Sequence, residues 1–195
     1  VIFVDDGSSD NTVGLVRNFH PPCEVRIISY IPNRGKGFAV RRGMLEAGND
    51  YVLFLDADMS APLEEINKFL PFLEKGYPVV IGSRKTAGAS VIKPQRWLRR
   101  KMGEFYTALA NLVTGAGVSD FTCGFKCFSR EAARKIFSGA KIERWSYDAE
   151  ILFLARQAGF DIREVGIRWE NDEDSRVRLG IDTFGSFWDL LKIRL

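Results

Sequence analysis

The sequence predicts an α/β fold, in which a doubly wound, mostly parallel sheet is covered by helices on both faces. Short runs of branched and aromatic residues alternate with longer segments of helical periodicity, and the links between them are short. Hydrophobic residues make up 46% of the 195 residues and charged residues 27%, which is typical of a globular domain. We therefore expect one domain over residues 1–195. Predicted strands cover residues 1–5, 25–29, 51–55, 79–82, 121–129 and 162–169.

Helical segments are predicted between these strands. Ser9 or Asp10 can cap the first helix, Gly48 ends the second, and Pro62 suits the first turn of the third. The predicted helices cover residues 9–19, 38–47, 63–75, 95–114, 132–137, 147–157 and 182–195.

Composition excludes several classes of function. A net charge of only +3 argues against a nucleic-acid partner. Three cysteines are too few for a disulfide framework and fit a reducing compartment. His20 is the only histidine, so triads and histidine-rich metal sites are not expected. The chain contains no apolar run of about 18 residues, so no transmembrane helix is predicted within it. Because Val1 already belongs to a predicted strand, we expect that the chain is a fragment of a longer protein.

The most informative feature is the pair of carboxylates in Asp56-Ala57-Asp58. They follow the predicted buried strand at residues 51–55, and a spacing of two residues along a strand places side chains on one side. A hard divalent cation, Mg²⁺ or Mn²⁺, would offset the repulsion between them, because such ions prefer carboxylate oxygens. The alternative is that both acids are solvated at the start of a loop.

Two further strand ends carry polar residues, and the carboxyl ends of parallel strands meet at one edge of the sheet. Asp6 could accept hydrogen bonds from a base or ribose, or could belong to a helix-capping turn. Arg84 follows another strand. The turn Gly35-Lys36-Gly37 could place amide groups and an ammonium near a phosphate, or could be a plain turn; it lacks the spacing of a P-loop.

Two predicted helices have distinctive faces. Arg96, Arg99 and Arg100 share one side of the helix at residues 95–114, and we expect them to lack acidic partners. This stripe could bind a phosphate or be solvated. One side of the last helix could lie on a membrane surface or pack on the core. Its apolar residues are Phe184, Phe187, Trp188, Leu191 and Leu195.

Five motifs in order resemble glycosyltransferase family 2, which has the GT-A fold, and within it the polyprenyl-phosphate sugar synthases. These motifs are Val-Asp-Asp-Gly-Ser-Ser-Asp at 4–10, Asn-Arg-Gly-Lys-Gly at 33–37, Phe-Leu-Asp-Ala-Asp at 54–58, Gly-Ser-Arg at 82–84 and Cys-Gly-Phe-Lys at 123–126. Two departures stand out: the opening strand of that family, with its Pro-x-Tyr-Asn-Glu loop, is absent before Val1, and Ser60 stands where mannose synthases often carry Gln.

The resemblance implies roles for single residues. On the donor side, Val4 and Asp6 would hold the nucleotide base, and Asn33 and Lys36 would lie near the donor. Asp56 would contact the ribose or sugar, and we also expect it to share the metal with Asp58.

On the acceptor side, Arg84 and Arg99 would bind the acceptor phosphate, and Asp120 would be an acid near the sugar. If the acceptor were instead a sugar hydroxyl, a carboxylate base would be required, and Asp148 or Asp120 would be the candidates.

The implied function is inverting transfer of a hexose from UDP-glucose or GDP-mannose to a polyprenyl or dolichyl phosphate, with Mg²⁺ or Mn²⁺ as cofactor. The expected location is cytoplasmic and peripheral to the membrane. A phosphate monoester has a second pKa of about 6, so it is an anion at neutral pH and needs little help from a base. The alternatives are a family 2 enzyme that acts on a hydroxyl, a metal phosphohydrolase, and a non-catalytic nucleotide-binding scaffold.

Overall fold

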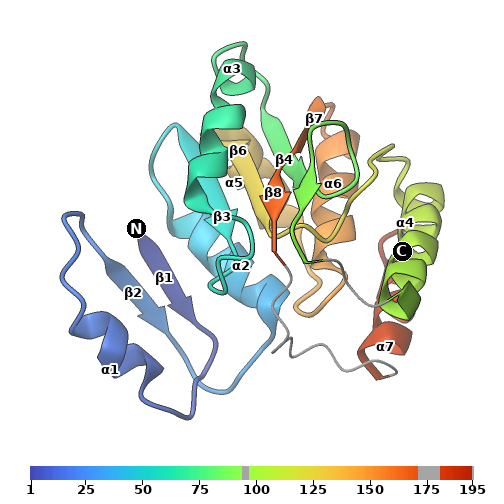
Figure 1. The fold of residues 1–195 in the computed structure, drawn as a ribbon. Coiled ribbons are helices and arrows are strands. Elements are labelled where there is room, and N and C mark those ends of the chain that lie inside the picture. Colours follow the sequence, from blue (N-terminus) through green and yellow to red (C-terminus); the bar gives the residue numbers. More distant parts are fainter. Residues whose placement is uncertain (94–96, 171–180, 195) are drawn as a thin grey trace.

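The computed structural model describes residues 1–93, 97–170 and 181–194, without the side chains of residues 98–99 and 181–184 (Figure 1). The strands are β1 (Ile2–Asp5), β2 (Arg26–Ser29), β3 (Tyr51–Leu55), β4 (Val79–Ser83), β5 (Ser90–Val91), β6 (Phe125–Ser129), β7 (Ile162–Gly166) and β8 (Arg168–Trp169). The helices are α1 (Thr12–Arg17), α2 (Lys36–Glu46), the 3₁₀ helix η1 (Leu63–Lys68), α3 (Leu70–Leu73), α4 (Trp97–Thr114), α5 (Arg130–Gly139), α6 (Tyr147–Gln157) and α7 (Ile181–Lys192).

The central sheet has four strands in the order β3-β6-β4-β7, and it is mixed. β4 and β7 are parallel, whereas β6 runs antiparallel to both β3 and β4. This reversed strand was not predicted from the sequence. β1 and β2 form a separate parallel pair, as do β5 and β8. The predicted α/β class with parallel pairings is confirmed, and the antiparallel course of β6 is a detail that the predicted, mostly parallel sheet did not include.

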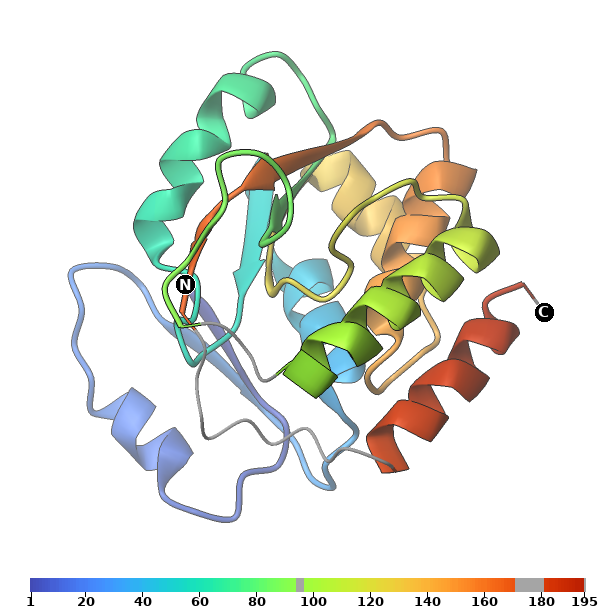
Figure 2. The ribbon, with the colours of Figure 1, turned by 45° about the vertical axis from the view of Figure 1, so that its right-hand side comes forward.

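Helices cover both faces of the central sheet. In Figure 2, α5 and α6 lie on one side of it, and η1 and α3 lie on the other. β-strand side chains alternate between the two faces, so neighbouring residues enter different cores. Val79 and Ile81 of β4 join the core under α2, α5 and α6, whereas Val80 joins the core under α3. The same alternation sends Lys126 of β6 toward α6, between Phe125 and Cys127, which both face α3.

Most predicted boundaries lie close to the observed ones. β3 and α6 have the predicted limits. The helix predicted at 63–75 is instead η1 followed by a short α3. The strand predicted to begin at Phe121 begins at Phe125, because residues 119–122 form a loop held by side chains rather than by a strand partner.

Candidate functional site

The reversed strand β6 brings a polar loop to the edge of the sheet where β3 and β4 end. Leu55, the last residue of β3, pairs with Phe125, the first residue of β6. The loop before Phe125 therefore meets the residues that follow β3, and the Asp56 amide donates to the Gly124 carbonyl (3.1 Å). Gly124 leaves room for the Asp56 side chain, because a Cβ at position 124 would lie 2.1 Å from the Asp56 carboxylate and would displace it.

Asp56 is paired with Lys36, the first residue of α2. The Lys36 ammonium lies 2.7 Å from Oδ1 and 2.8 Å from Oδ2 of Asp56. Burial alone would lower the pKa of Lys36, but the charge of Asp56, with smaller contributions from Asp148 and Asp58, outweighs it and raises that pKa. Lys36 thus remains an ammonium that already neutralises the first acid of the Asp-x-Asp pair.

Asp58 is exposed and does not share the strand geometry that the sequence analysis assumed. Residues 56–59 form a turn in which the Met59 amide donates to the Asp56 carbonyl (3.1 Å) and Met59 has φ of 54°. The pleat argument for placing both acids on one side is therefore wrong. The Asp58 carboxylate accepts one hydrogen bond, from the Ser60 amide (2.9 Å).

These residues fit a cation held mainly by one protein carboxylate. Among the described residues, no group of three or more His, Cys, Asp or Glu is arranged to hold a metal. Mg²⁺ commonly binds through one or two carboxylates and completes its shell with water and substrate phosphates. Asp58 suits such a ligand, whereas Asp56 would have to release Lys36.

Asp6 organises the turn that leads into α2. Its carboxylate accepts hydrogen bonds from the Asn33 side chain and from the amides of Arg34 and Gly35, each at 2.8 Å. Val4 lies behind this turn and faces α2, where a Cβ on Gly43 would be 3.1 Å from its Cγ2. The predicted contacts of Val4, Asp6 and Asn33 with a nucleotide stay predictions, and in the structure Asp6 and Asn33 shape the turn that carries Lys36.

Arg84 and Asp120 form a buried ion pair at the end of β4. Arg84 Nε and Nη2 donate to the two Asp120 oxygens at 2.7 and 2.8 Å, and the Arg84 amide adds a third bond at 3.0 Å. Burial would raise the pKa of Asp120, but the Arg84 charge and hydrogen bonds hold it below its ordinary value. The guanidinium also lies 5.0 Å from the Trp169 ring centroid. Arg84 is thus committed to Asp120, which disfavours the predicted role as a free phosphate ligand.

Glu164 is a site residue that sequence reasoning missed. It lies on β7, and its carboxylate accepts hydrogen bonds from the Ser119 hydroxyl (2.7 Å) and from the amides of Ser119 (3.0 Å) and Asp120 (2.8 Å). It therefore holds the loop that presents Asp120. An acid in the middle of a predicted strand, Ile162-Arg163-Glu164-Val165, was the available signal.

Lys126 belongs to the motif Cys-Gly-Phe-Lys at 123–126, and no role was predicted for it from the sequence. In the structure it is the buried partner of Asp148. Its ammonium is fully buried, lies 2.5 Å from Asp148 Oδ1 and donates to the Cys123 carbonyl (2.5 Å). Burial raises the pKa of Asp148, and the charges of Lys126 and Lys36 only partly offset that effect. Both carboxylates proposed as bases, Asp148 and Asp120, are thus buried beside a cation.

The predicted arginine stripe is only partly visible. Arg96 and the side chain of Arg99 lie outside the described residues. Arg100 is exposed and pairs with Glu104 at 3.7 Å, so the expectation that these arginines lack acidic partners is wrong for Arg100. Lys85, directly after Arg84, donates to the Thr107 hydroxyl (3.0 Å) and so connects the end of β4 to α4.

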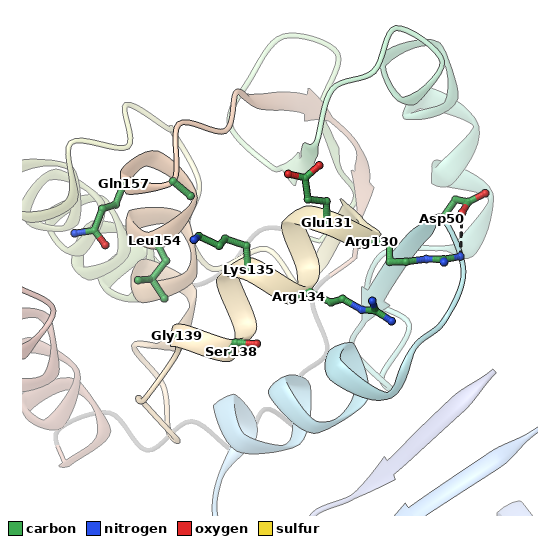
Figure 3. Close-up of a pocket in the computed structure, with 10 residues that line it drawn as sticks. Asp50, Arg130, Glu131, Arg134, Lys135, Ser138, Gly139, Leu154 and Gln157 are labelled. Atoms are coloured by element: carbon green, nitrogen blue, oxygen red, sulfur yellow. Dashed lines mark hydrogen bonds and ion pairs between the residues drawn. The ribbon is translucent and has the colours of Figure 1, made fainter.

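A solvent-open hollow of about 1140 Å³ lies away from these residues, between α5, α6 and the start of β3 (Figure 3). Asp50, which precedes β3, pairs with Arg130 at its rim. Because Asp56 follows the other end of β3, the hollow lies at the opposite edge of the sheet. The Lys36–Asp56 edge, where the predicted site residues gather, is therefore the candidate site, and this hollow lies apart from it.

The fold and this edge define a Rossmann-like α/β domain whose charged residues lie where strands end, the usual ligand-binding position in such sheets. Residues 1–137 match the family described as glycosyl transferase family 2. The chain belongs to that family.

Curated relatives agree with this assignment. The dolichyl-phosphate beta-glucosyltransferase of Dictyostelium discoideum is 32% identical over 202 residues, covering 100% of this chain and 62% of the relative. The proteins of that name from Drosophila melanogaster (34%; 99% of this chain and 60% of the relative) and Homo sapiens (32%; 100% and 63%) are similar. The chain spans about three fifths of the length of these relatives.

Solved structures confirm the GT-A fold. Glucosyl-3-phosphoglycerate synthase from Mycobacterium tuberculosis in complex with UDP superposes with a TM-score of 0.69 at 21% identity, over 98% of this chain and 68% of that one. The same synthase with Mn²⁺ and UDP-glucose gives a TM-score of 0.71 at 21% identity, over 98% and 67%. At this identity the likeness establishes the fold alone.

Proposed function

We propose that this chain transfers a glucosyl group from UDP-glucose to a polyprenyl phosphate of the dolichyl type, with inversion at the anomeric carbon. Family membership supports the transfer reaction, and the relatives named above support the lipid phosphate and the glucosyl group. A single direct displacement inverts the anomeric centre.

The observation that carries the proposal is that both candidate bases are engaged. Asp120 is held by Arg84 with a lowered pKa, and Asp148 is buried against Lys126. A sugar hydroxyl would need a carboxylate to take its proton. A phosphate monoester is already an anion at neutral pH and attacks without that help. The site therefore favours a phosphate acceptor over a hydroxyl acceptor.

The donor side supplies positive charge where a nucleoside diphosphate would leave. Lys36 is an ammonium at the start of α2, and the positive end of a helix dipole attracts phosphates. In this proposal Asp6 and Asn33 keep the turn before α2 in shape, and Lys36 exchanges part of its contact with Asp56 for a donor phosphate. Fixed cations of this kind stabilise charge that develops in the transition state.

We further propose Mg²⁺ or Mn²⁺ as cofactor, held by Asp58. When bound, such an ion supplies positive charge to the leaving diphosphate. Asp58 suits this role because its carboxylate is exposed and, within the part of the chain that the structure describes, accepts one hydrogen bond. The lipid acceptor implies work at a membrane surface, as expected from the sequence. No helix among the described residues combines the length and apolarity needed to cross a bilayer.

The test is an assay of glucosyl transfer from UDP-glucose to a short-chain polyprenyl phosphate in detergent, with and without Mn²⁺. Asp58→Asn should lower the Mn²⁺-dependent rate by at least about a hundredfold, since a lost charge-stabilising group costs several kcal/mol. Asp161→Asn, at an exposed aspartate before β7, is the matched control and should leave the rate unchanged.

Two parallel measurements separate the alternatives. Glucose transfer to the matching polyprenol, which lacks the phosphate, would contradict the proposed acceptor. Calorimetry that shows UDP binding, together with no transfer to any acceptor, would favour a non-catalytic scaffold. Equal rates for Asp58→Asn and wild type would reject the metal role.

A further inference from the structure

The glycine-rich turn before α2 packs against a loop that joins α5 to α6. We call this loop, residues 140–146, the support loop. A Cβ on Gly35 would lie 2.6 Å from the Glu143 carbonyl oxygen, and a Cβ on Gly37 would lie 2.5 Å from the Ile142 carbonyl oxygen. Real Cβ atoms are essentially never this close to another atom, so a larger residue would push the two segments apart. The glycines of this turn are therefore explained by the close approach of two backbones.

The support loop also completes the first turn of α2. The amides in the first turn of a helix have no partner inside the helix, and a side chain just before the helix commonly accepts from one of them. α2 begins after Gly35, which has no side chain for this purpose. The Phe38 amide instead donates to the Glu143 carbonyl (3.0 Å). The backbone of the support loop therefore fixes the start of the helix from which Lys36 extends.

An ion pair closes the same contact at the surface. Arg34 donates through Nη2 and Nε to the Glu143 carboxylate, and Nε lies 3.4 Å from Oε2. The Arg34 guanidinium also lies over the Phe38 ring, 3.7 Å from its centroid. The two charged side chains are 44% and 39% exposed, and an exposed ion pair contributes little to global stability. Replacing either side chain should therefore alter the contact without unfolding the chain.

The support loop is itself anchored at both ends. At its start, the buried Glu150 carboxylate on α6 accepts hydrogen bonds from the amides of Lys141 and Ile142, each at 2.8 Å. At its end, the buried Ser146 hydroxyl donates to the Ser186 carbonyl of α7 (2.9 Å). Because both ends have fixed partners, the support loop can hold the turn before α2 in one position.

We propose that the support loop positions Lys36 for the donor diphosphate, with Glu143 and Arg34 as positioning residues. This inference rests on the proposed function, in that Lys36 contacts a donor phosphate. Once the Lys36 ammonium exchanges Asp56 for that phosphate, the backbone of the turn decides where the ammonium can reach. Asp6 holds that backbone from one side and the support loop holds it from the other. A group that is already in place avoids an ordering cost when the ligand binds.

The experiment is a double-mutant cycle on the dissociation constant of UDP, measured by calorimetry with Mn²⁺ present. Glu143→Ala should raise this constant about three- to fivefold, which is the loss expected for one exposed ion pair. In a chain that already carries Lys36→Met, Glu143→Ala should have no further effect, because the support loop acts on the ligand through Lys36. A loss of equal size in both backgrounds would overturn the inference.

A second cycle separates positioning from direct contact with the donor. If Arg34 acts through its pair with Glu143, Arg34→Ala should weaken UDP binding as much as Glu143→Ala does. The double variant should then bind UDP no more weakly than either single variant. A loss with Arg34→Ala and none with Glu143→Ala would mean that the arginine contacts the donor itself, and the positioning role would be rejected.

Asp50→Ala is the matched control, because it breaks the exposed pair with Arg130 at the opposite edge of the sheet, and UDP affinity should stay unchanged. Hydrogen exchange at the Phe38 amide adds a measurement without any ligand. This exchange should become faster in Glu143→Ala and in Arg34→Ala, and it should match the wild type in Asp50→Ala. Unchanged exchange in the first two variants would contradict the support of the turn.

The Lys36→Met chain separates a failure of this inference from a failure of the proposed function. If Lys36→Met leaves UDP binding intact, or if the wild type binds no UDP, the donor contact is wrong and both proposals fall. If Lys36→Met weakens UDP binding and Glu143→Ala does not, the donor contact stands and only the positioning role is overturned.

Discussion

Single residues at the site act in pairs of opposite charge. Lys36 pairs with Asp56, Arg84 with Asp120, and Lys126 with Asp148. Two of these pairs are buried, where removing one partner leaves a charge without compensation. Their energetic importance therefore shows most clearly when one member is replaced.

Arg84→Gln should lower the free energy of unfolding by about 3–5 kcal/mol at neutral pH, because it leaves the Asp120 carboxylate buried and unpaired. Urea unfolding measures this change. Arg26→Gln, which breaks the exposed pair with Glu46, is the control and should change stability by no more than about 1 kcal/mol.

The loss of unfolding free energy caused by Arg84→Gln should depend on pH. In the wild type the pKa of Asp120 lies below its ordinary value of 3.8, so the carboxylate stabilises the fold above that pH and this contribution is lost as pH falls through the lowered pKa. In the variant, burial without Arg84 raises that pKa. The difference between wild type and variant should therefore be largest at neutral pH and shrink on acidification. A difference that grows in acid would contradict the assignment.

At the scale of elements, the reversal of β6 decides what the site contains. The loop before β6 reaches the edge where β3 and β4 end only because β6 is antiparallel to both. β7 then fixes that loop through Glu164, whose carboxylate receives two backbone amides and a hydroxyl. Glu164 is thus a positioning residue for Asp120.

Glu164→Gln should loosen residues 119–122 without unfolding β7. The new amide nitrogen would face N–H donors that now meet a carboxylate, and a buried donor left unpaired costs about 1–3 kcal/mol. Hydrogen exchange should become faster at the amides of Ser119 and Asp120, and urea should show the stability loss. Glu74→Gln, at an exposed glutamate after α3, is the control. Unchanged exchange at both amides would refute the role.

At the scale of the whole molecule, the core under α3 encloses two of the three cysteines and leaves the third outside. Cys23 is exposed, whereas Cys123 and Cys127 are buried in the core under α3. Burial raises the pKa of each of these two thiols to about 12. A buried thiol with a raised pKa is inert until the structure opens.

A thiol reagent at mildly alkaline pH should therefore modify one cysteine quickly in the native chain, and the other two only after denaturant is added. Cys23→Ser should abolish the fast phase, which identifies its source. Two fast thiols in the wild type would show that the α3 side of the sheet is open to solvent.

Local patterns were sufficient for most of the elements and for the family. The apolar run 51–55 and the periodicity of 147–157 predicted β3 and α6 with their observed limits. The order of five short motifs indicated the family that residues 1–137 match. In both cases the information lies in neighbouring residues, because hydrophobic periodicity and turn chemistry are local properties.

The partners of the site residues were not predictable in this way. The sequence by itself determined that Asp56, Asp58, Asp120 and Asp148 are present near the ends of elements. Only the tertiary structure decided that three of them face lysine or arginine from distant segments while Asp58 stays exposed. The physical reason is that these ion pairs depend on strand direction and on the alternation of side chains across the sheet. The antiparallel course of β6 brings Lys126 and the Asp120 loop into place. That course is set by packing between segments far apart in the chain, which local sequence patterns do not contain.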